Sequence, residues 1–105
     1  MNAEEKAKKI REILEDKKAN GVEILSLKGK SPIAEYFVIA SGTSNTHINA
    51  LADEVEEKMM ELANPFMNHE GEHGSAWRLI DYGDVIVHIF SEETRKMYKL
   101  EELWK

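Results

Sequence analysis

Residues 35–45 read EYFVIASGTSN, and this stretch decides the fold. Its first part, EYFVIAS, is a nearly unbroken run of aromatic and aliphatic side chains, typical of a strand that is covered on both faces of a sheet. The following SGTSN segment supplies a glycine for a bend and small hydroxyl side chains that cap helices. We therefore predict a strand at the centre of the sheet over residues 35–41, followed by a turn and a helix.

The helix after this turn is the longest predicted element. Its apolar residues recur at three- and four-residue spacing: Ile48, Leu51, Ala52, Val55, Met59 and Leu62. Asn64 and Pro65 end the periodic pattern. Residues 66–75 contain an asparagine and two glycines without any periodicity, so we expect a loop there.

The flanking segments complete the predicted order of elements. Residues 3–19 have the spacing of an amphipathic helix, with Gly21 expected to close it, and residues 22–27 form a short strand. Residues 77–80 and 85–90 are two apolar runs joined by a hairpin turn, and Ser91 can cap a closing helix. The order αββαββα predicts an α/β (α+β) fold, in which helices pack on a mixed sheet.

Length and composition limit the kind of protein. A chain of 105 residues suits a single domain over residues 1–105, and 42% hydrophobic with 32% charged residues is a globular composition. The sequence contains no cysteine, no stretch long enough to cross a membrane and no secretory signal, so we expect a cytoplasmic protein. Residues 31–105 hold six basic and fourteen acidic residues. This acidic surface disfavours nucleic-acid binding and favours a basic protein partner.

Residues 69–73 read HEGEH, which matches the H-E-x-x-H pattern of zinc proteases. That pattern binds zinc only on a helix, where two histidines one turn apart point to the same side. Gly71 inside the motif and Pro65 before it oppose a helix. We therefore expect no metal site.

The bend at Gly42 allows two readings. Backbone N–H groups and hydroxyls at a helix start can bind an anion, but the turn has no P-loop lysine. The simpler reading is that Gly42 makes the bend and that Ser44 or Asn45 caps the helix. A hydrolase triad built from Ser41 or Ser44, His47 or His88, and Asp81 or Asp84 has no supporting G-x-S-x-G motif.

The apolar hairpin at residues 77–90 carries polar residues that need explanation. His88 interrupts the run VIVHIF, where a histidine in the core or on the sheet face with one hydrogen-bond partner is expected. Asp81 and Asp84 flank the turn, where acids commonly bond their own backbone. Trp77 and Tyr82 beside these acids would suit docking to a basic protein.

Several dispersed strings together point to a family. They are EYFVIASGTSNTH, Gly74 with Trp77, DYGDVIVHIF, EETRKMY and LEELW, and they extend from about Ala7 to Trp104. The chain resembles the ribosomal silencing factor family, also called Iojap-like proteins. One departure is Thr46, since the family commonly has arginine before the histidine of this turn.

The resemblance implies a cytoplasmic translation repressor. Such a factor binds the large ribosomal subunit through ribosomal protein uL14, sterically blocks joining of the small subunit and lowers translation in starvation or stationary phase. The implied fold is similar to that of nucleotidyltransferases without their catalytic acids, and the implied state in solution is a homodimer. The alternative is a nucleotide-binding, transferase-like enzyme that uses the Gly42 turn.

The resemblance and the hairpin chemistry together predict the site. We expect no catalytic residue, cofactor, metal or specific nucleic-acid contact. The predicted partner-binding residues are Trp77, Asp81, Tyr82, Asp84, His88 and Tyr98. The first four lie close together in one hairpin, so we expect them to form a single patch.

Overall fold

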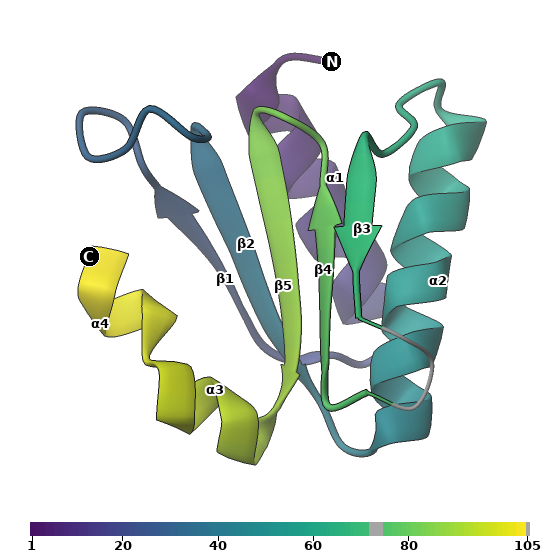
Figure 1. The fold of residues 1–105 in the computed structure, drawn as a ribbon. Helices are drawn as coiled ribbons and strands as arrows, with labels where there is room; N and C mark the ends of the chain where they lie inside the picture. The colour runs from purple at the N-terminus through teal and green to yellow at the C-terminus, as the bar shows by residue number, and fades with distance from the viewer. Residues whose placement is uncertain (72–74, 105) are drawn as a thin grey trace.

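In the computed structural model, which describes residues 1–71 and 75–104, the chain forms a five-stranded sheet with helices on both faces (Figure 1). The elements are α1 (Ala3–Asp16), β1 (Asn20–Ser26), β2 (Tyr36–Gly42), α2 (Asn45–Glu61), β3 (Asn68–Glu70), β4 (Trp77–Asp81), β5 (Val85–Ser91), α3 (Glu92–Tyr98) and α4 (Leu100–Trp104). The strand order is β1-β2-β5-β4-β3, with β2 and β5 parallel and the other neighbours antiparallel. The predicted α/β class with a mixed sheet is therefore confirmed.

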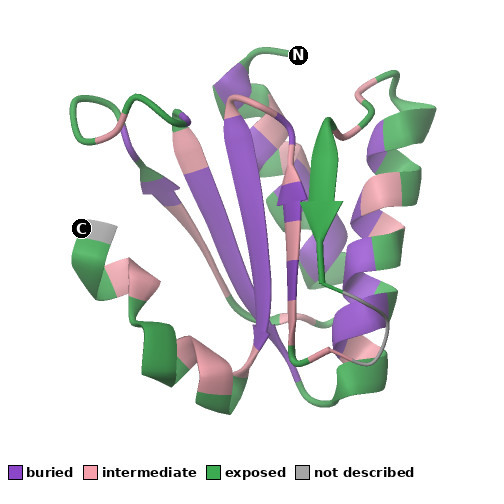
Figure 2. Ribbon diagram, viewed as in Figure 1, coloured by how far each residue is buried: buried purple, intermediate pink, exposed green. Residues whose placement is uncertain are grey.

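Strand β2 is the strand that residues 35–41 predict, and both its faces are covered. Val38, Ile39 and Ala40 are inaccessible to solvent, and Figure 2 shows β2 and β5 almost entirely buried. The middle position of the sheet belongs to β5, with β2 beside it. Parallel strands need a long connection, and α2 with the β3–β4 segment provides it between β2 and β5.

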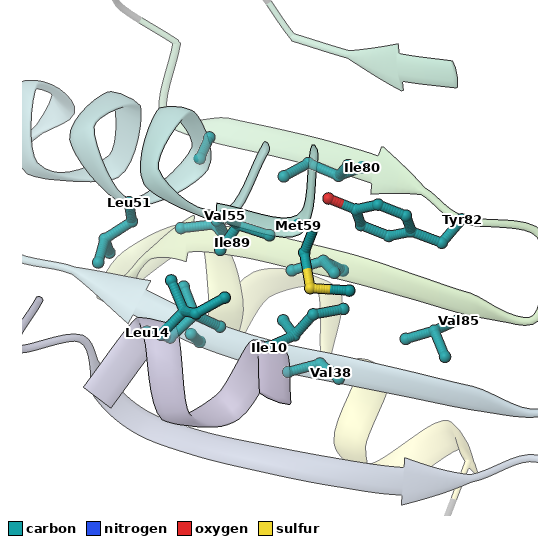
Figure 3. Close-up of a cluster of buried hydrophobic side chains, with 14 of the residues drawn as sticks. Ile10, Leu14, Val38, Leu51, Val55, Met59, Ile80, Tyr82, Val85 and Ile89 are labelled. Carbon is teal, nitrogen blue, oxygen red and sulfur yellow. The ribbon is translucent and has the colours of Figure 1, made fainter. Parts of the chain in front are cut away.

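One face of the sheet packs against α1 and α2, and we call it the helix face. Side chains alternate between the two sides of a strand, so Val38, Val87 and Ile89 all point toward these helices. They meet apolar side chains at helical spacing in a core shown in Figure 3, namely Ile10 and Leu14 of α1 and Leu51, Val55 and Met59 of α2. This spacing is the pattern that predicted both helices.

The opposite face, which we call the open face, is covered only in part. Its buried residues are Leu25, Leu27, Ala34, Phe37, Ile39, Ile86 and Phe90. Helices α3 and α4 approach this face, and Leu100 packs against its apolar cluster. The open face is thus the part of the sheet on which aromatic side chains can remain accessible.

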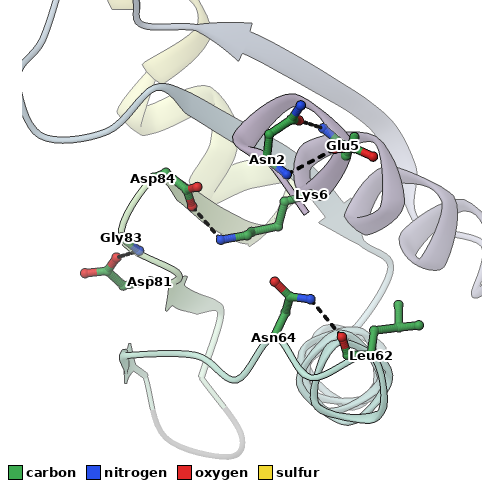
Figure 4. A network of polar contacts seen from close by, with 8 residues as sticks. All are labelled: Asn2, Glu5, Lys6, Leu62, Asn64, Asp81, Gly83 and Asp84. Atoms are coloured by element: carbon green, nitrogen blue, oxygen red, sulfur yellow. Dashed lines mark hydrogen bonds and ion pairs between the residues drawn. The ribbon is translucent and has the colours of Figure 1, made fainter.

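The first helix starts as its sequence suggests and ends earlier than predicted. Asn2 accepts a hydrogen bond from the backbone N–H of Glu5, and the Glu5 carboxylate accepts one from the N–H of Asn2 (Figure 4). The helix ends at Asp16, not at residue 19, and Lys18 takes the left-handed conformation with a φ of 63°. Gly21 does not close the helix but lies within β1, at an irregularity of its pairing with β2.

Two further predictions were wrong. Residues 68–70 form strand β3 inside the predicted loop, because the backbone of β4 offers a pairing edge that needs no apolar pattern. The closing helix is two short helices, because Lys99 adopts a left-handed φ of 51° between them. Residues 72–74 of the predicted loop lie outside the described part of the chain.

Candidate functional site

The expected patch of Trp77, Asp81, Tyr82 and Asp84 does not form. Trp77 and Asp81 share the open face with Leu79, because they occupy alternate positions of β4. Tyr82 points into the core of the helix face, where it lies among the residues of Figure 3. Four residues close in the sequence are therefore divided between the two sides of the sheet.

Tyr82 and Asp84 have contacts that keep them away from the open face. Tyr82 is 5% exposed, and burial raises the pKa of its phenol. Its hydroxyl has no hydrogen-bond partner within the described residues. An oxygen of Asp84 accepts a hydrogen bond from the Lys6 ammonium of α1 at 2.8 Å, as Figure 4 shows. Both residues join the turn to the helix layer.

Asp81 confirms the expectation that a turn acid bonds its own backbone. Its carboxylate accepts a hydrogen bond from the N–H of Gly83 at 2.7 Å (Figure 4). Gly83 has a φ of 88°, a conformation that glycine adopts without steric cost. The contact holds one oxygen of Asp81 at the turn, beside the open face.

Three predicted site residues do meet, in a pocket of the open face. Trp77, His88 and Tyr98 line an open pocket of about 210 Å³ together with Phe90 and Leu100. The ring centroids of Trp77 and Tyr98 lie 6.5 Å and 5.8 Å from that of Phe90. We call these five residues the open-face pocket. Its walls come from β4, β5 and the α3–α4 segment, and they are almost wholly apolar.

His88 lies at the base of this arrangement and is 8% exposed. Its ring is edge-on to Phe37, with centroids 4.9 Å apart, and stacks with Phe90 at 5.8 Å. The expected hydrogen-bond partner is absent from the described residues, since neither ring nitrogen has one. Burial among aromatic rings disfavours the charged imidazolium and lowers the pKa of His88 to about 4. The side chain is therefore neutral at pH 7.

Two carboxylates lie on the same open face as this pocket, on strands β3 and β4. In the ladder between β3 and β4, Glu70 lies opposite Leu79 and Asn68 lies opposite Asp81. Directly paired residues project to the same side of a sheet, so Glu70 and Asp81 flank Leu79 on the open face. We call Glu70 and Asp81 the acidic border. An apolar pocket beside an acidic border suits a partner surface that is apolar at its centre and basic around it.

Sequence reasoning missed four residues of this surface. Leu79 and Phe90 could have been found, because every second residue of a strand shares a face, which places Leu79 with Trp77 and Phe90 with His88. Leu100 and Glu70 depend on elements that the sequence did not predict, the break at Lys99 and strand β3. No local signal identified them.

The bend at Gly42 is fully explained by packing and capping. A Cβ atom on Gly42 would lie 2.8 Å from Cγ1 of Ile48, so only glycine allows this approach of strand and helix. Ser44 is the cap, and it accepts a hydrogen bond from the N–H of His47 at 3.1 Å. The N–H of Thr43 donates to Nδ1 of His47 at 3.0 Å, and Nε2 of His47 lies 2.9 Å from the carbonyl oxygen of Lys17.

The HEGEH motif is not helical where the structure describes it. His69 belongs to β3, where Nδ1 lies 2.7 Å from a carboxylate oxygen of Glu56 and the ring stacks on Phe66. His73 lies outside the described residues. Over residues 1–71 and 75–104, no three His, Asp or Glu side chains gather in a way that could hold a metal ion. None of the helices in those ranges combines the length and apolarity needed to cross a bilayer.

The helix-backed sheet, with its accessible aromatic pocket and acidic border, defines a small α/β protein suited to docking on another protein. Comparison with known proteins gives the family. The model of the family described as "Ribosomal silencing factor during starvation" matches residues 1–105, and the chain belongs to this family. The Iojap-like resemblance is thereby confirmed, and the protein is a ribosome-associated regulator of translation.

Individual relatives agree with this assignment. The ribosomal silencing factor RsfS of Halalkalibacterium halodurans is 41% identical over 91 residues, which cover 87% of this chain and 78% of the relative. A mouse protein named "Mitochondrial assembly of ribosomal large subunit protein 1" is 30% identical, over 88% of this chain and 42% of its own. A crystal structure of a protein from Chromobacterium violaceum superposes with a TM-score of 0.95 at 33% identity, covering 99% of this chain and 87% of the other.

Proposed function

We propose that this protein is a translation repressor that binds the large ribosomal subunit through ribosomal protein uL14. In this proposal the bound protein sterically blocks joining of the small subunit and so lowers translation in starvation or stationary phase. It acts in the cytoplasm as one domain over residues 1–105, with no cofactor and no catalytic residue. A homodimer in solution is part of the proposal.

The observation that carries the proposal is the open-face pocket beside the acidic border. Large aromatic side chains in accessible pockets are the residues that most often dominate binding energy at protein interfaces. Trp77 and Tyr98 are such residues, and Tyr98 is 56% exposed although its ring lies against Phe90. Carboxylates beside such a pocket attract basic surfaces and raise the rate of association.

The predicted site residues take two roles in this proposal. Trp77, His88 and Tyr98 form the contact surface for uL14, and Asp81 borders it. Tyr82 and Asp84 lie on the helix face instead, where Tyr82 packs in the core and Asp84 pairs with Lys6, and these contacts hold the hairpin turn against the helices. The second group therefore supports the site without touching the partner.

The rival function, nucleotide-dependent transfer at the Gly42 turn, has less support. The Ser44 hydroxyl already accepts a hydrogen bond from the N–H of His47, and the N–H of Thr43 already donates to Nδ1 of His47. Ile48 lies directly against Gly42, because a Cβ atom added to Gly42 would come within 2.8 Å of its Cγ1. Calorimetry with ATP and Mg²⁺ separates the two functions, because binding at micromolar affinity would favour the enzyme.

Co-sedimentation with purified ribosomal particles tests the proposed function. The protein should pellet with large subunits and not with small subunits or complete ribosomes, because the occupied surface is covered in the complete particle. Adding the protein to large subunits before small subunits should reduce the yield of complete ribosomes. Equal pelleting with all three particles would contradict occlusion.

A further inference from the structure

We infer that Arg95 is a positioning residue for partner recognition, because its guanidinium holds the α3–α4 segment over the open face. This inference rests on the proposed function, since it concerns the pocket that is proposed to bind uL14. Arg95 does not line the open-face pocket. It acts through Tyr98 and Leu100, which supply the pocket walls that do not belong to the sheet.

The Arg95 side chain joins four parts of the chain. One terminal nitrogen donates to the hydroxyl of Ser41 in β2 at 2.9 Å and to the carbonyl of Asn20 at 3.3 Å. The other donates to the carbonyl of Gly21 in β1 at 2.7 Å. Nε donates to the carboxylate of Glu101 in α4. The side chain is 13% exposed, and hydrogen bonds from a charged guanidinium are stronger than those between neutral groups.

Besides Arg95, the α3–α4 segment is held by the ring contact of Tyr98 with Phe90 and by the packing of Leu100. Helix α3 spans Glu92–Tyr98 and has no buried residue, while α4 spans only Leu100–Trp104. Helices this short are unstable in water without tertiary contacts. The left-handed φ of Lys99 interrupts the two, so they cannot support each other as one helix. Ser91 at the end of β5 caps α3 by accepting a hydrogen bond from the N–H of Thr94, and Arg95 connects α3 to β1 and β2.

Strand β1 is irregular at Gly21, where its carbonyl accepts the hydrogen bond from Arg95. Gly21 has a φ of 52° and lies where the pairing of β1 with β2 shifts between Asn20 and Glu23. A Cβ atom at Gly21 would lie 2.9 Å from a terminal nitrogen of Arg95. The glycine that does not close α1 therefore serves a different purpose, since it lets a strand carbonyl and the guanidinium approach closely.

The test combines hydrogen exchange with binding to purified uL14, using Arg95→Gln and the matched control Lys96→Gln. Both variants lose one positive charge from α3, but Lys96 is exposed and outside the network. Arg95→Gln should speed amide exchange in residues 92–103 by roughly tenfold or more with little change in overall melting temperature. It should weaken binding by roughly tenfold. Lys96→Gln should change neither quantity by more than about twofold.

Two further variants keep the test decisive. Arg95→Lys should give intermediate values, because an ammonium cannot reproduce the planar fork of hydrogen bonds. If Arg95→Gln lowers the overall melting temperature, Ser41→Ala removes only one bond of the network and should show smaller changes in the same direction. Faster exchange in residues 92–103 with wild-type affinity would overturn a role in recognition.

The exchange measurement separates this inference from the proposed function. Unchanged exchange in Arg95→Gln would overturn the positioning role whether or not uL14 binds. If wild-type protein fails to bind uL14 while Arg95→Gln loosens residues 92–103, the proposed partner is wrong and Arg95 still holds the segment.

Discussion

Trp77 and Tyr82 lie at opposite ends of one hairpin arm and face opposite sides of the sheet. Trp77→Ala should weaken binding to uL14 by about 30-fold or more, because a buried aromatic anchor contributes about 2 kcal/mol or more at an interface. Surface plasmon resonance with immobilised uL14 would measure the loss. Circular dichroism and the melting temperature must be recorded beside it, since Trp77 also packs on the apolar cluster.

Tyr82→Phe is the matched aromatic control for this experiment. It removes a buried hydroxyl that has no hydrogen-bond partner within the described residues. Binding should stay at the wild-type level, and stability should be unchanged or higher by up to about 1 kcal/mol. A folded Trp77→Ala protein that binds uL14 with wild-type affinity would move the docking surface away from the open-face pocket.

His88 makes stability depend on pH in a defined window. Its pKa is lowered from 6.5 to about 4, so between these values the unfolded chain binds a proton that the folded protein does not. The contribution of His88 to the free energy of unfolding is therefore fully present above pH 6.5 and is lost as the pH falls toward 4. The loss from this residue should reach about 3 kcal/mol at most.

The measurement is urea unfolding of wild-type protein and His88→Leu at a series of pH values. Carboxylates also titrate near pH 4, so the informative quantity is the difference between the two proteins. The difference in free energy of unfolding between wild-type protein and His88→Leu should change between pH 6.5 and 4 and be constant above pH 7. Parallel stability curves over the whole range would show that His88 is not held neutral by burial.

At the scale of elements, strand β3 replaces the metal-binding helix that HEGEH would need. The double variant His69→Ala with His73→Ala should leave the metal content unchanged. His69 lies in the edge strand β3 and contacts Glu56 of α2, so it is not part of a metal-binding helix. Stability should fall by about 1 kcal/mol or less, since the contact of His69 is largely exposed. Elemental analysis and thermal unfolding measure the two effects. Stoichiometric zinc in the wild type that disappears in the variant would contradict the expectation.

Element boundaries show which local signals are reliable. The apolar spacing of α2 and its cap act within a few residues, so the sequence located the helix and narrowed the cap to Ser44 or Asn45, of which Ser44 is the cap. Strand β3 has three exposed residues and exists through backbone bonds to β4. The α3–α4 break occurs at a lysine, which has no intrinsic preference for a left-handed conformation. Such features depend on distant backbone and cannot be read from periodicity.

At the scale of the whole molecule, the net charge of −6 should steer association with a basic partner. Asp81→Asn and Glu70→Gln remove charges of the acidic border and should lower the association rate a few-fold at low salt, with a flatter salt dependence. Stopped-flow association at several salt concentrations measures both effects.

Asp84→Asn is the control for these variants, because it removes the same single negative charge at a position outside the acidic border. Its carboxylate pairs with Lys6 on the helix side, so the variant should keep most of the salt dependence and lose a little stability. An Asp84→Asn effect on association as large as that of Asp81→Asn would mean that total charge, and not the acidic border, guides binding.

The sequence by itself determined the fold class, most of the strands and helices, and the family. These properties follow from side-chain periodicity, turn chemistry and ordered motifs, which are local in the chain. Trp77, His88 and Tyr98 were also identified from sequence, and the structure brings them into one pocket. Residue type and the family motifs singled them out, and their contact with a partner stays a prediction.

Only the tertiary structure decided which of these residues share a surface. Adjacent positions of a strand point to opposite sides, so one step along the hairpin separates Asp81 on the open face from Tyr82 in the core. One wall of the pocket is formed by Tyr98 and Leu100, and Arg95 of the same segment donates hydrogen bonds to carbonyls more than seventy residues away in the sequence. A surface made by sheet pairing and by such a long-range contact has no counterpart in local sequence, because its parts meet only when the chain is folded.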